Sequence, residues 1–250
     1  MNSLNDAAAP AADPVHQQLD TTEPDPRFRE EIQAMSWVLE QVRAGEKLPV
    51  VEAEAIAHML HVDMRPEGEP KLYLIPLHAM HDYGAVHALN VAMLVMGLAE
   101  FTGMEQDSIR AIGLAGLLHD IGMVRVPVEL LAKSEQLDPS EREQIRAHPV
   151  EGARIIVESN AALELAAVVA YEHHLRADRT GYPALSYPRE PHSVSRMVAV
   201  CDTFHALRSP RPFREPWPLE IIFSFLHQRA GFEYDARYVG ALTEMVRRQQ

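Results

Sequence analysis

The sequence predicts an all-α fold, a helical bundle with a metal site at the helix ends and short accessory helices at its N-terminus. Three observations support this expectation. Apolar residues recur at helical spacing through most of the 250 residues. No segment shows the alternation of apolar and polar residues that marks a half-buried strand. Histidines and aspartates gather at the ends of the predicted helices.

The first 69 residues are expected to be accessory to the bundle. Residues 1–26 are rich in Ala, Pro and Asp and lack apolar periodicity, which is the composition of a disordered N-terminal tail. Residues 27–69 hold two short helical patterns: a stripe that ends before Gly45, and a second pattern over 51–60. The stripe consists of Ile32, Met35, Val38, Leu39 and Val42.

The bundle itself is expected over residues 70–250. The segment 86–101 is apolar on nearly all sides, and a helix of that kind lies at the centre of a bundle. Helical patterns then continue to the end of the chain, without an internal repeat. They cover 107–119, 139–148, 161–174, 193–207, 218–227 and 236–247.

Composition excludes several classes of function. The formal net charge of −13 argues against an open nucleic-acid surface, although a small phosphate ligand in a local basic pocket remains compatible with it. The single cysteine, Cys201, excludes an intramolecular disulfide and a multi-cysteine zinc site. The longest apolar run, 91–99, is far shorter than the roughly 20 residues of a membrane span. The N-terminus lacks a secretory signal pattern, so we expect a cytoplasmic protein that neither spans a membrane nor binds nucleic acid.

The chemistry of the chain is indicated by where its histidines fall. Seven of the 13 histidines lie among ordinary helix or loop residues and are interpreted as surface or core residues. The others stand at helix ends or beside acids, and imidazole with carboxylate is the ligand set for Zn, Fe or Mn. Asp120 is the best candidate to bridge two ions, because it follows His119 at a helix end. The full series is His87, His119 with Asp120, His148, His173 with His174, and Asp202 with His205.

This series resembles the HD-GYP domain, a branch of the HD phosphohydrolase superfamily whose members hydrolyse cyclic di-GMP. The resemblance covers roughly residues 70–215 and implies an HD-type helical bundle. Five segments carry it: VHALNV at 86–91, LLHDIG at 117–122, AHPVEGARI at 147–155, HHLRADRTGYP at 173–183 and VAVCDTFHALRSPRPFR at 198–214.

The resemblance implies a role for each matching position. Two divalent transition-metal ions, Fe or Mn, would be held, and Asp120 would be the catalytic bridge between them. A metal-bound hydroxide would then cleave cyclic di-GMP to pGpG, and in a second cut to GMP. Tyr182, Arg211 and Arg214 would bind substrate, although packing of Tyr182 under its loop and solvent-facing charge for the arginines are the plainer alternatives. The first ion would be held by His87, His119, Asp120 and Asp202, and the second by Asp120, His148, His173 and His174.

The chain departs from the family pattern at five positions. Tyr83 replaces a glutamate that binds a third ion in some relatives, Met123 replaces the lysine of HDIGK, and His205 replaces a second aspartate. The family's HHE ends here in Leu175, and its DG ends in Arg179. These departures favour two ions over three, and they leave room for a slow enzyme.

Three functions therefore remain open from the sequence. The first is a metal-dependent phosphodiesterase for cyclic di-GMP. The second is a degenerate domain that binds cyclic di-GMP, or a GGDEF-type diguanylate cyclase, without efficient hydrolysis. The third is a phosphohydrolase for another cyclic dinucleotide. A homodimer is a further arrangement to test.

Overall fold

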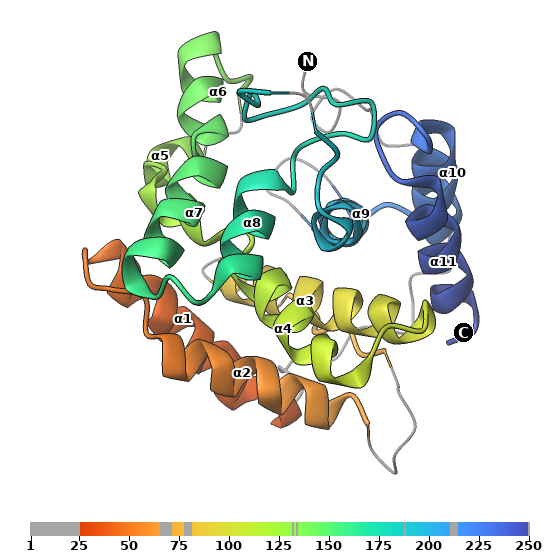
Figure 1. Cartoon of the computed structure of the whole chain (residues 1–250), viewed down its shortest axis with the longest axis horizontal. Helices are drawn as coiled ribbons and strands as arrows, with labels where there is room; N and C mark the ends of the chain where they lie inside the picture. Colours follow the sequence, from red (N-terminus) through yellow and green to blue (C-terminus); the bar gives the residue numbers. More distant parts are fainter. Residues whose placement is uncertain are drawn as a thin grey trace.

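The computed structural model describes residues 26–65, 72–77, 82–131, 133, 135–187, 189–210 and 215–249. Within these ranges there is no β-strand, only two isolated bridges, Leu175 with Gly181 and Ala230 with Tyr234. The predicted all-α fold is therefore confirmed (Figure 1). The helices are η1 (Pro26–Phe28), α1 (Arg29–Arg43), α2 (Val50–Asp63), α3 (Tyr83–Phe101), α4 (Gln106–Leu118), η4 (Ile121–Arg125), α5 (Val128–Leu131), α6 (Pro139–Arg146), α7 (His148–Ser159), α8 (Glu164–Glu172), α9 (Ser193–Arg208), α10 (Leu219–Arg229) and α11 (Ala236–Arg247).

The centre of the bundle is α3, as its apolar pattern predicts. It packs against α4 along its length and also contacts α1, α2, α9 and α11. In Figure 1, α3 and α4 run across the view while α9 is seen nearly end-on, so α9 crosses the pair at a steep angle. Among the described helices, α3 is also long and apolar enough to cross a membrane, but 78% of that window is buried inside the protein. Its hydrophobicity is explained by its central position.

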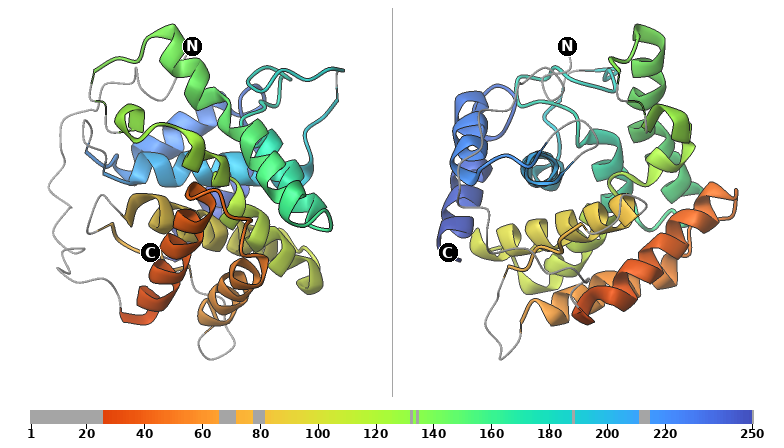
Figure 2. Two further views of the ribbon diagram at one scale, coloured as in Figure 1. Left: turned by 90° about the vertical axis from the view of Figure 1, so that its left-hand side faces the viewer. Right: turned by 180° about the vertical axis from the view of Figure 1, so that it is seen from behind.

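The accessory helices pack directly on the bundle. Figure 2 shows α1 and α2 side by side beneath α3 and α4, and α1 contacts α3 while α2 contacts α4. Their buried residues, such as Met35, Val38 and Leu60, belong to the same hydrophobic cluster as the α3 side chains. Both predicted N-terminal helices are thus confirmed. Residues 1–25 of the predicted tail lie outside the described residues.

One helix prediction is corrected by the structure. The pattern over 139–148 indicated a single helix, but α6 ends at Arg146 and α7 begins at His148. Asp138 and Glu141 form a capping box that starts α6. Pro149, at the second position of α7, cannot continue α6 because it lacks a backbone N–H and its ring would clash with the preceding turn. Helix α7, which the sequence pattern missed, therefore starts in a new direction with His148 at its first position.

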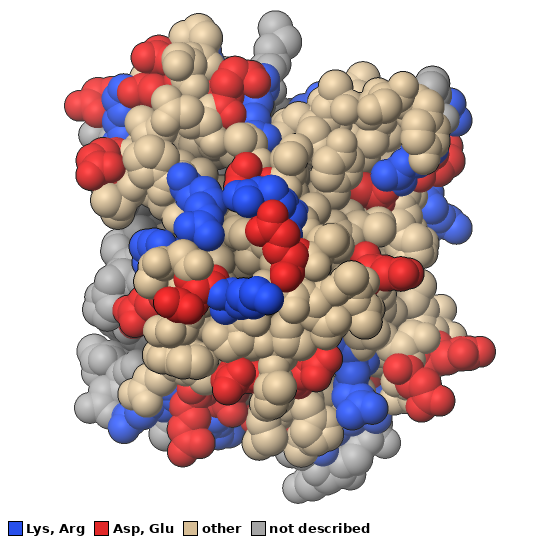
Figure 3. All heavy atoms as spheres, turned by 60° about the vertical axis from the view of Figure 1, so that its left-hand side comes forward, with Lys and Arg blue, Asp and Glu red and all other residues tan. Residues whose placement is uncertain are grey.

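The charges on one face of the molecule are mixed in sign. On the face shown in Figure 3, arginine and lysine side chains lie beside aspartate and glutamate side chains, and no large area of one sign is visible.

Candidate metal centre

The seven ligands predicted from the sequence come together from five helices. Asp202 lies within α9 and His87 within α3, whereas the other ligands stand at helix ends. They form two groups, and within each group the potential ligand atoms lie within 4.8 Å of one another. The first group is His87, His119 and Asp202, and the second is Asp120, His148, His173 and His174.

Asp120 lies between the two groups and faces both of them. Its Oδ2 is 3.7 Å from His87 Nε2 and 3.6 Å from His119 Nε2. Its Oδ1 is 3.1 Å from His148 Nε2 and 3.4 Å from His173 Nε2. Each carboxylate oxygen is therefore directed to a different group of histidines, which is the arrangement of a bridging ligand. The side chain is 28% exposed, so a ligand can reach it from solvent.

Three of the imidazoles are oriented by backbone carbonyls in the last turn of the preceding helix. The Nδ1 atoms of His119 and His148 lie 2.7 Å from the carbonyl oxygens of Gly116 and Ile145, and His173 Nδ1 lies 2.9 Å from that of Ala170. A carbonyl only accepts, so each Nδ1 carries the hydrogen. In the neutral ring the lone pair is then on Nε2, directed into the site, as metal ligands in proteins commonly are.

His87 is oriented differently, through a buried polar network. Its Nε2 lies 3.2 Å from Asp202 Oδ1, and its Nδ1 lies 2.8 Å from His205 Nδ1. His205 Nε2 is 2.9 Å from the Asn90 side-chain nitrogen, and Asn90 also bonds both backbone groups of Ile75. His205, one of the departures from the family pattern, therefore contacts His87 through the ring nitrogen of His87 that does not contact Asp202.

Tyr83, another departure, packs on the same histidine. Its ring lies parallel to the His87 ring, with 5.6 Å between centroids and an interplanar angle of 7°. An aromatic ring that stacks on a ligand offers no carboxylate at this position. The number of ions that the site holds stays a prediction.

Burial and charge set the protonation of the cluster. Burial lowers the pKa of His119 to about 4 and holds the pKa of His174 well below its usual value. Burial alone would raise the pKa of Asp120, but the charge of His119 and the nearby rings of His148 and His173 outweigh it and hold that pKa well below its usual value. Burial thus favours the neutral imidazole at His119 and His174. Burial also acts to lower the pKa of His173, but the carboxylate of Asp120 outweighs it and raises that pKa above its usual value.

The donor set fits metal ions. His119 Nε2 and Asp120 Oδ1 are buried and make no hydrogen bond within the described part of the chain. A buried polar atom without a hydrogen bond is costly, and coordination to a cation would satisfy both atoms. Nitrogen and oxygen donors without a thiolate suit Fe, Mn or Zn.

The loop after α8, which carries Gly181 and Tyr182, packs against the second group of candidate ligands. Gly181 has φ +95, and a Cβ there would lie 2.2 Å from the His174 carbonyl oxygen, so this position requires glycine. The Tyr182 ring stacks on His174 at 4.5 Å and meets the edge of His148 at 6.2 Å. The Tyr182–Pro183 peptide bond is cis. Tyr182 thus lies against two predicted ligands, whereas Arg211 and Arg214, the predicted phosphate contacts, lie outside the described residues.

Two supporting residues were missed in the sequence. Glu172, which is fully buried, accepts hydrogen bonds from His192 N and Ser195 Oγ and pairs with Arg189. Arg146 places its guanidinium carbon 5.4 Å from the Tyr182 ring centre. Each residue is close in sequence to a predicted ligand, but nothing in the local pattern shows what it contacts.

Comparisons with known proteins agree with this geometry. Residues 74–238 match the HD domain family. The chain is 32% identical to a cyclic di-GMP phosphodiesterase of Pseudomonas aeruginosa, over 70% of this chain and 42% of that protein. It is 29% identical to 3′3′-cGAMP-specific phosphodiesterase 2 of Vibrio cholerae, over 74% of this chain and 36% of that protein. The chain therefore spans less than half the length of these two relatives.

A solved structure shows a related fold. It is that of an HDG"Y"P protein from Bdellovibrio bacteriovorus, with a TM-score of 0.62 and 16% sequence identity. The alignment covers 87% of this chain and 69% of that chain.

Proposed function

Because the chain belongs to the HD domain family, we propose that it is a metal-dependent phosphodiesterase that hydrolyses cyclic di-GMP to pGpG and, in a second cut, to GMP. The observation that carries the proposal is the position of Asp120, whose two carboxylate oxygens face separate histidine groups. A carboxylate whose two oxygens face separate groups can bridge the two ions of a binuclear site. The relatives named as cyclic di-GMP phosphodiesterases support the choice of substrate.

The two groups would hold one ion each, with Asp120 shared between them. Fe or Mn is the proposed identity, since the donors are imidazole nitrogens and carboxylate oxygens without a thiolate. When bound, such ions supply an activated water and stabilise charge on a phosphoryl group. The low pKa of His119 keeps its Nε2 free of a proton for coordination.

The protein's own side chains would orient the substrate. Tyr182 forms a wall beside His148 and His174, where one face of a bound nucleotide can pack. Arg211 and Arg214 are proposed to contact phosphate oxygens, as the family resemblance implies. Asp120 would position the reacting groups through its two oxygens and is the proposed catalytic residue.

Elemental analysis and a hydrolysis assay on the same samples test the proposal. We expect wild-type protein to contain about two Fe or Mn ions and to release pGpG from cyclic di-GMP. Asp120→Ala should lose both ions and all hydrolysis, because the bridge serves both groups. Glu220→Ala is the control, since Glu220 is an exposed acid of α10 whose carboxylate pairs with Arg247 of α11. It should retain metal and activity.

Two outcomes would contradict the proposal. Unchanged metal content in Asp120→Ala would show that Asp120 does not bridge two ions. A metal-loaded wild type that binds cyclic di-GMP and returns it intact would instead indicate a receptor, which the replacements at Tyr83, Met123 and His205 leave open.

A second candidate substrate is another cyclic dinucleotide. The similarity to a 3′3′-cGAMP-specific phosphodiesterase favours it. A panel of cyclic di-GMP, 3′3′-cGAMP and cyclic di-AMP, compared by kcat/KM, would identify the preferred substrate. Preference for cyclic di-GMP supports the main proposal.

Location and partners complete the proposal. We propose a cytoplasmic protein, since the expected substrate is an intracellular messenger. A GGDEF-type diguanylate cyclase and a second copy of the chain are the proposed protein partners. Co-purification with such a cyclase and the mass of the protein in solution would test them.

A further inference from the structure

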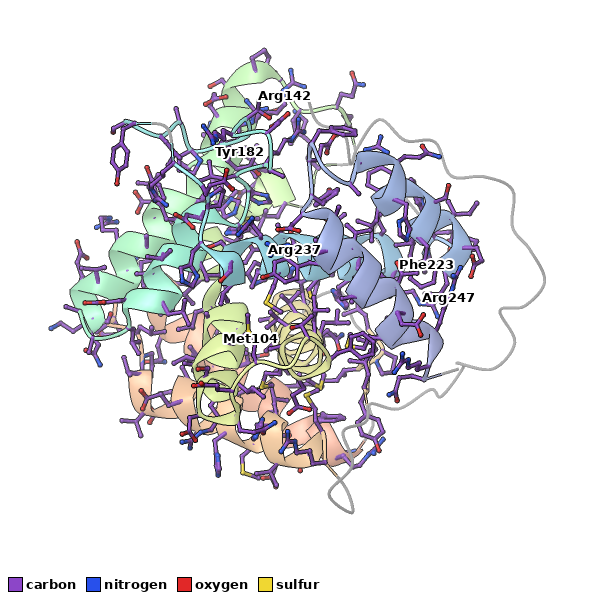
Figure 4. The ribbon with its side chains drawn as sticks, turned by 45° about the vertical axis from the view of Figure 1, so that its right-hand side comes forward. Met104, Arg142, Tyr182, Phe223, Arg237 and Arg247 are labelled. Atoms are coloured by element: carbon purple, nitrogen blue, oxygen red, sulfur yellow. The ribbon has the colours of Figure 1, made fainter. Side chains whose placement is uncertain are left out.

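Arg146 lies beside the candidate site, although no sequence motif assigned it a role. It is the last residue of α6 and stands two residues before the ligand His148. Its guanidinium carbon lies 5.4 Å from the centre of the Tyr182 ring, within the range of a cation–π contact. Figure 4 labels Tyr182 on the loop after α8, close to α6. The same Tyr182 ring contacts both Arg146 and His174.

The charge of Arg146 is only weakly neutralised. Its Nη1 donates to Glu143 Oε1 at 3.0 Å, but the Glu143 side chain is 70% exposed, and pairs of this kind contribute little. Its Nε is buried and makes no hydrogen bond within the described residues. A buried donor without an acceptor calls for an explanation, and a bound anion is one.

The shape of the guanidinium suits a phosphate. A guanidinium that packs against an aromatic face keeps its edge N–H groups available for two parallel hydrogen bonds to an anion. Arg146 contacts Tyr182, whose ring centre is 4.5 Å from that of His174. Arg146 is not itself one of the residues whose donor atoms form the two groups, so an anion that it contacts would lie beside these groups and not between them.

We propose that Arg146 binds a phosphate of the nucleotide other than the one under attack. This inference rests on the proposed function, because a cyclic dinucleotide carries two phosphates. Arg146 supplies a cation near the site, where Met123 replaces the lysine expected from the family pattern. It acts in substrate binding and selects substrates with a second phosphate over simple phosphodiesters.

The test compares two substrates on metal-loaded, full-length protein. Bis(p-nitrophenyl) phosphate has one phosphate, and cyclic di-GMP has two. For Arg146→Ala we expect the loss in kcat/KM on cyclic di-GMP to exceed the loss on the simple diester by about 10- to 100-fold, mainly through KM. Arg146→Lys should recover part of the loss, since it retains the charge without the planar fork. Arg154→Ala is the matched control, because Arg154 is an exposed residue of α7 that pairs with Glu151 and Glu158.

Each outcome decides the inference. An unchanged KM for cyclic di-GMP in Arg146→Ala overturns it and leaves the phosphodiesterase proposal intact. Equal losses on both substrates also overturn it, since they show that Arg146 acts through the packing of Tyr182. If the wild type hydrolyses no cyclic dinucleotide, the proposed function fails. The role of Arg146 is then tested by measuring the binding of pGpG to the wild type and to Arg146→Ala by calorimetry. A wild type that does not bind pGpG, or a variant that binds it equally well, then overturns the inference.

Discussion

Asp120 reaches both histidine groups because the chain turns tightly just after it. Gly122, in η4, lies against the start of α7, where a Cβ would be 2.0 Å from the His148 carbonyl oxygen and 2.6 Å from Gly152 N. No side chain fits there, so only glycine lets η4 approach α7 this closely. This approach brings Asp120 Oδ1 to 3.1 Å from His148 Nε2.

Gly122→Ala should therefore disturb both stability and metal binding. Backbone atoms surround the position, so η4 must move away from α7, at a cost of roughly 1 to 3 kcal/mol. Urea unfolding and elemental analysis would measure the two effects. Gly240→Ala in α11 is the control, because a Cβ there meets nothing within 4 Å. A Gly122→Ala protein with wild-type stability and metal content would refute the close-packing argument.

Helix ends are the elements that build the site. The last turns of α4, α6 and α8 each provide a carbonyl that receives a histidine Nδ1–H. The end of α8 is in turn held by Glu172, which precedes His173 and bonds His192 N at 2.7 Å and Ser195 Oγ at 2.8 Å. This fully buried carboxylate joins α8 to the start of α9, and so fixes both ends of the loop that carries Tyr182.

Glu172→Gln is expected to loosen this connection. The amide retains the shape of the carboxylate but loses its charge, and its NH₂ group would face hydrogen-bond donors. We therefore expect the free energy of unfolding to fall by about 1 to 3 kcal/mol. The loop over 173–192 should also be cut faster by trypsin, which limited proteolysis would show. Glu190→Gln is the matched control, because the Glu190 side chain is 59% exposed and its ion pairs lie at the surface. Equal behaviour of the two variants would argue against the anchoring role.

For the whole molecule, a single hydrophobic cluster joins the accessory helices, α3 and the C-terminal helices. Polar contacts add to it where α9 meets α11. Asp235 starts α11 by accepting from Arg237 N, and its carboxylate lies 2.9 Å from Arg196 Nη1 in α9. Hydrogen bonds from Arg237, together with its charge and that of Arg196, hold the pKa of Asp235 below its usual value of 3.8.

The sign of this shift predicts how stability depends on pH. Because the pKa of Asp235 is lower in the folded state, its ionised carboxylate stabilises that state above the unfolded pKa of 3.8. This stabilisation is lost as pH falls through the folded pKa. Asp235→Asn should therefore be less stable than wild type at about pH 7, by about 1 to 3 kcal/mol. The difference should shrink below about pH 4. Urea unfolding at both pH values measures it, and a difference that stays constant with pH would contradict the assignment.

The helical fold was predictable from the sequence because apolar periodicity is a local property. The all-round apolar segment at 86–101 specified a central helix, and α3 occupies that position. The helix predicted over 139–148 runs two residues past the end of α6, and α7 was missed although a proline in the first turn, here Pro149, is typical of a helix start. The predicted domain limits at residues 26 and 70 stay predictions.

The candidate ligand residues could also be selected from the sequence, since the spacing of histidines and aspartates places each one on or at the end of a helix. Their grouping was decided by tertiary structure, because it depends on how five helices meet. The division of Asp120 between two histidine groups, the support of His87 by His205 and the position of Arg146 over Tyr182 all join residues far apart in the chain. Such contacts follow from packing directions, and local periodicity carries no information about them.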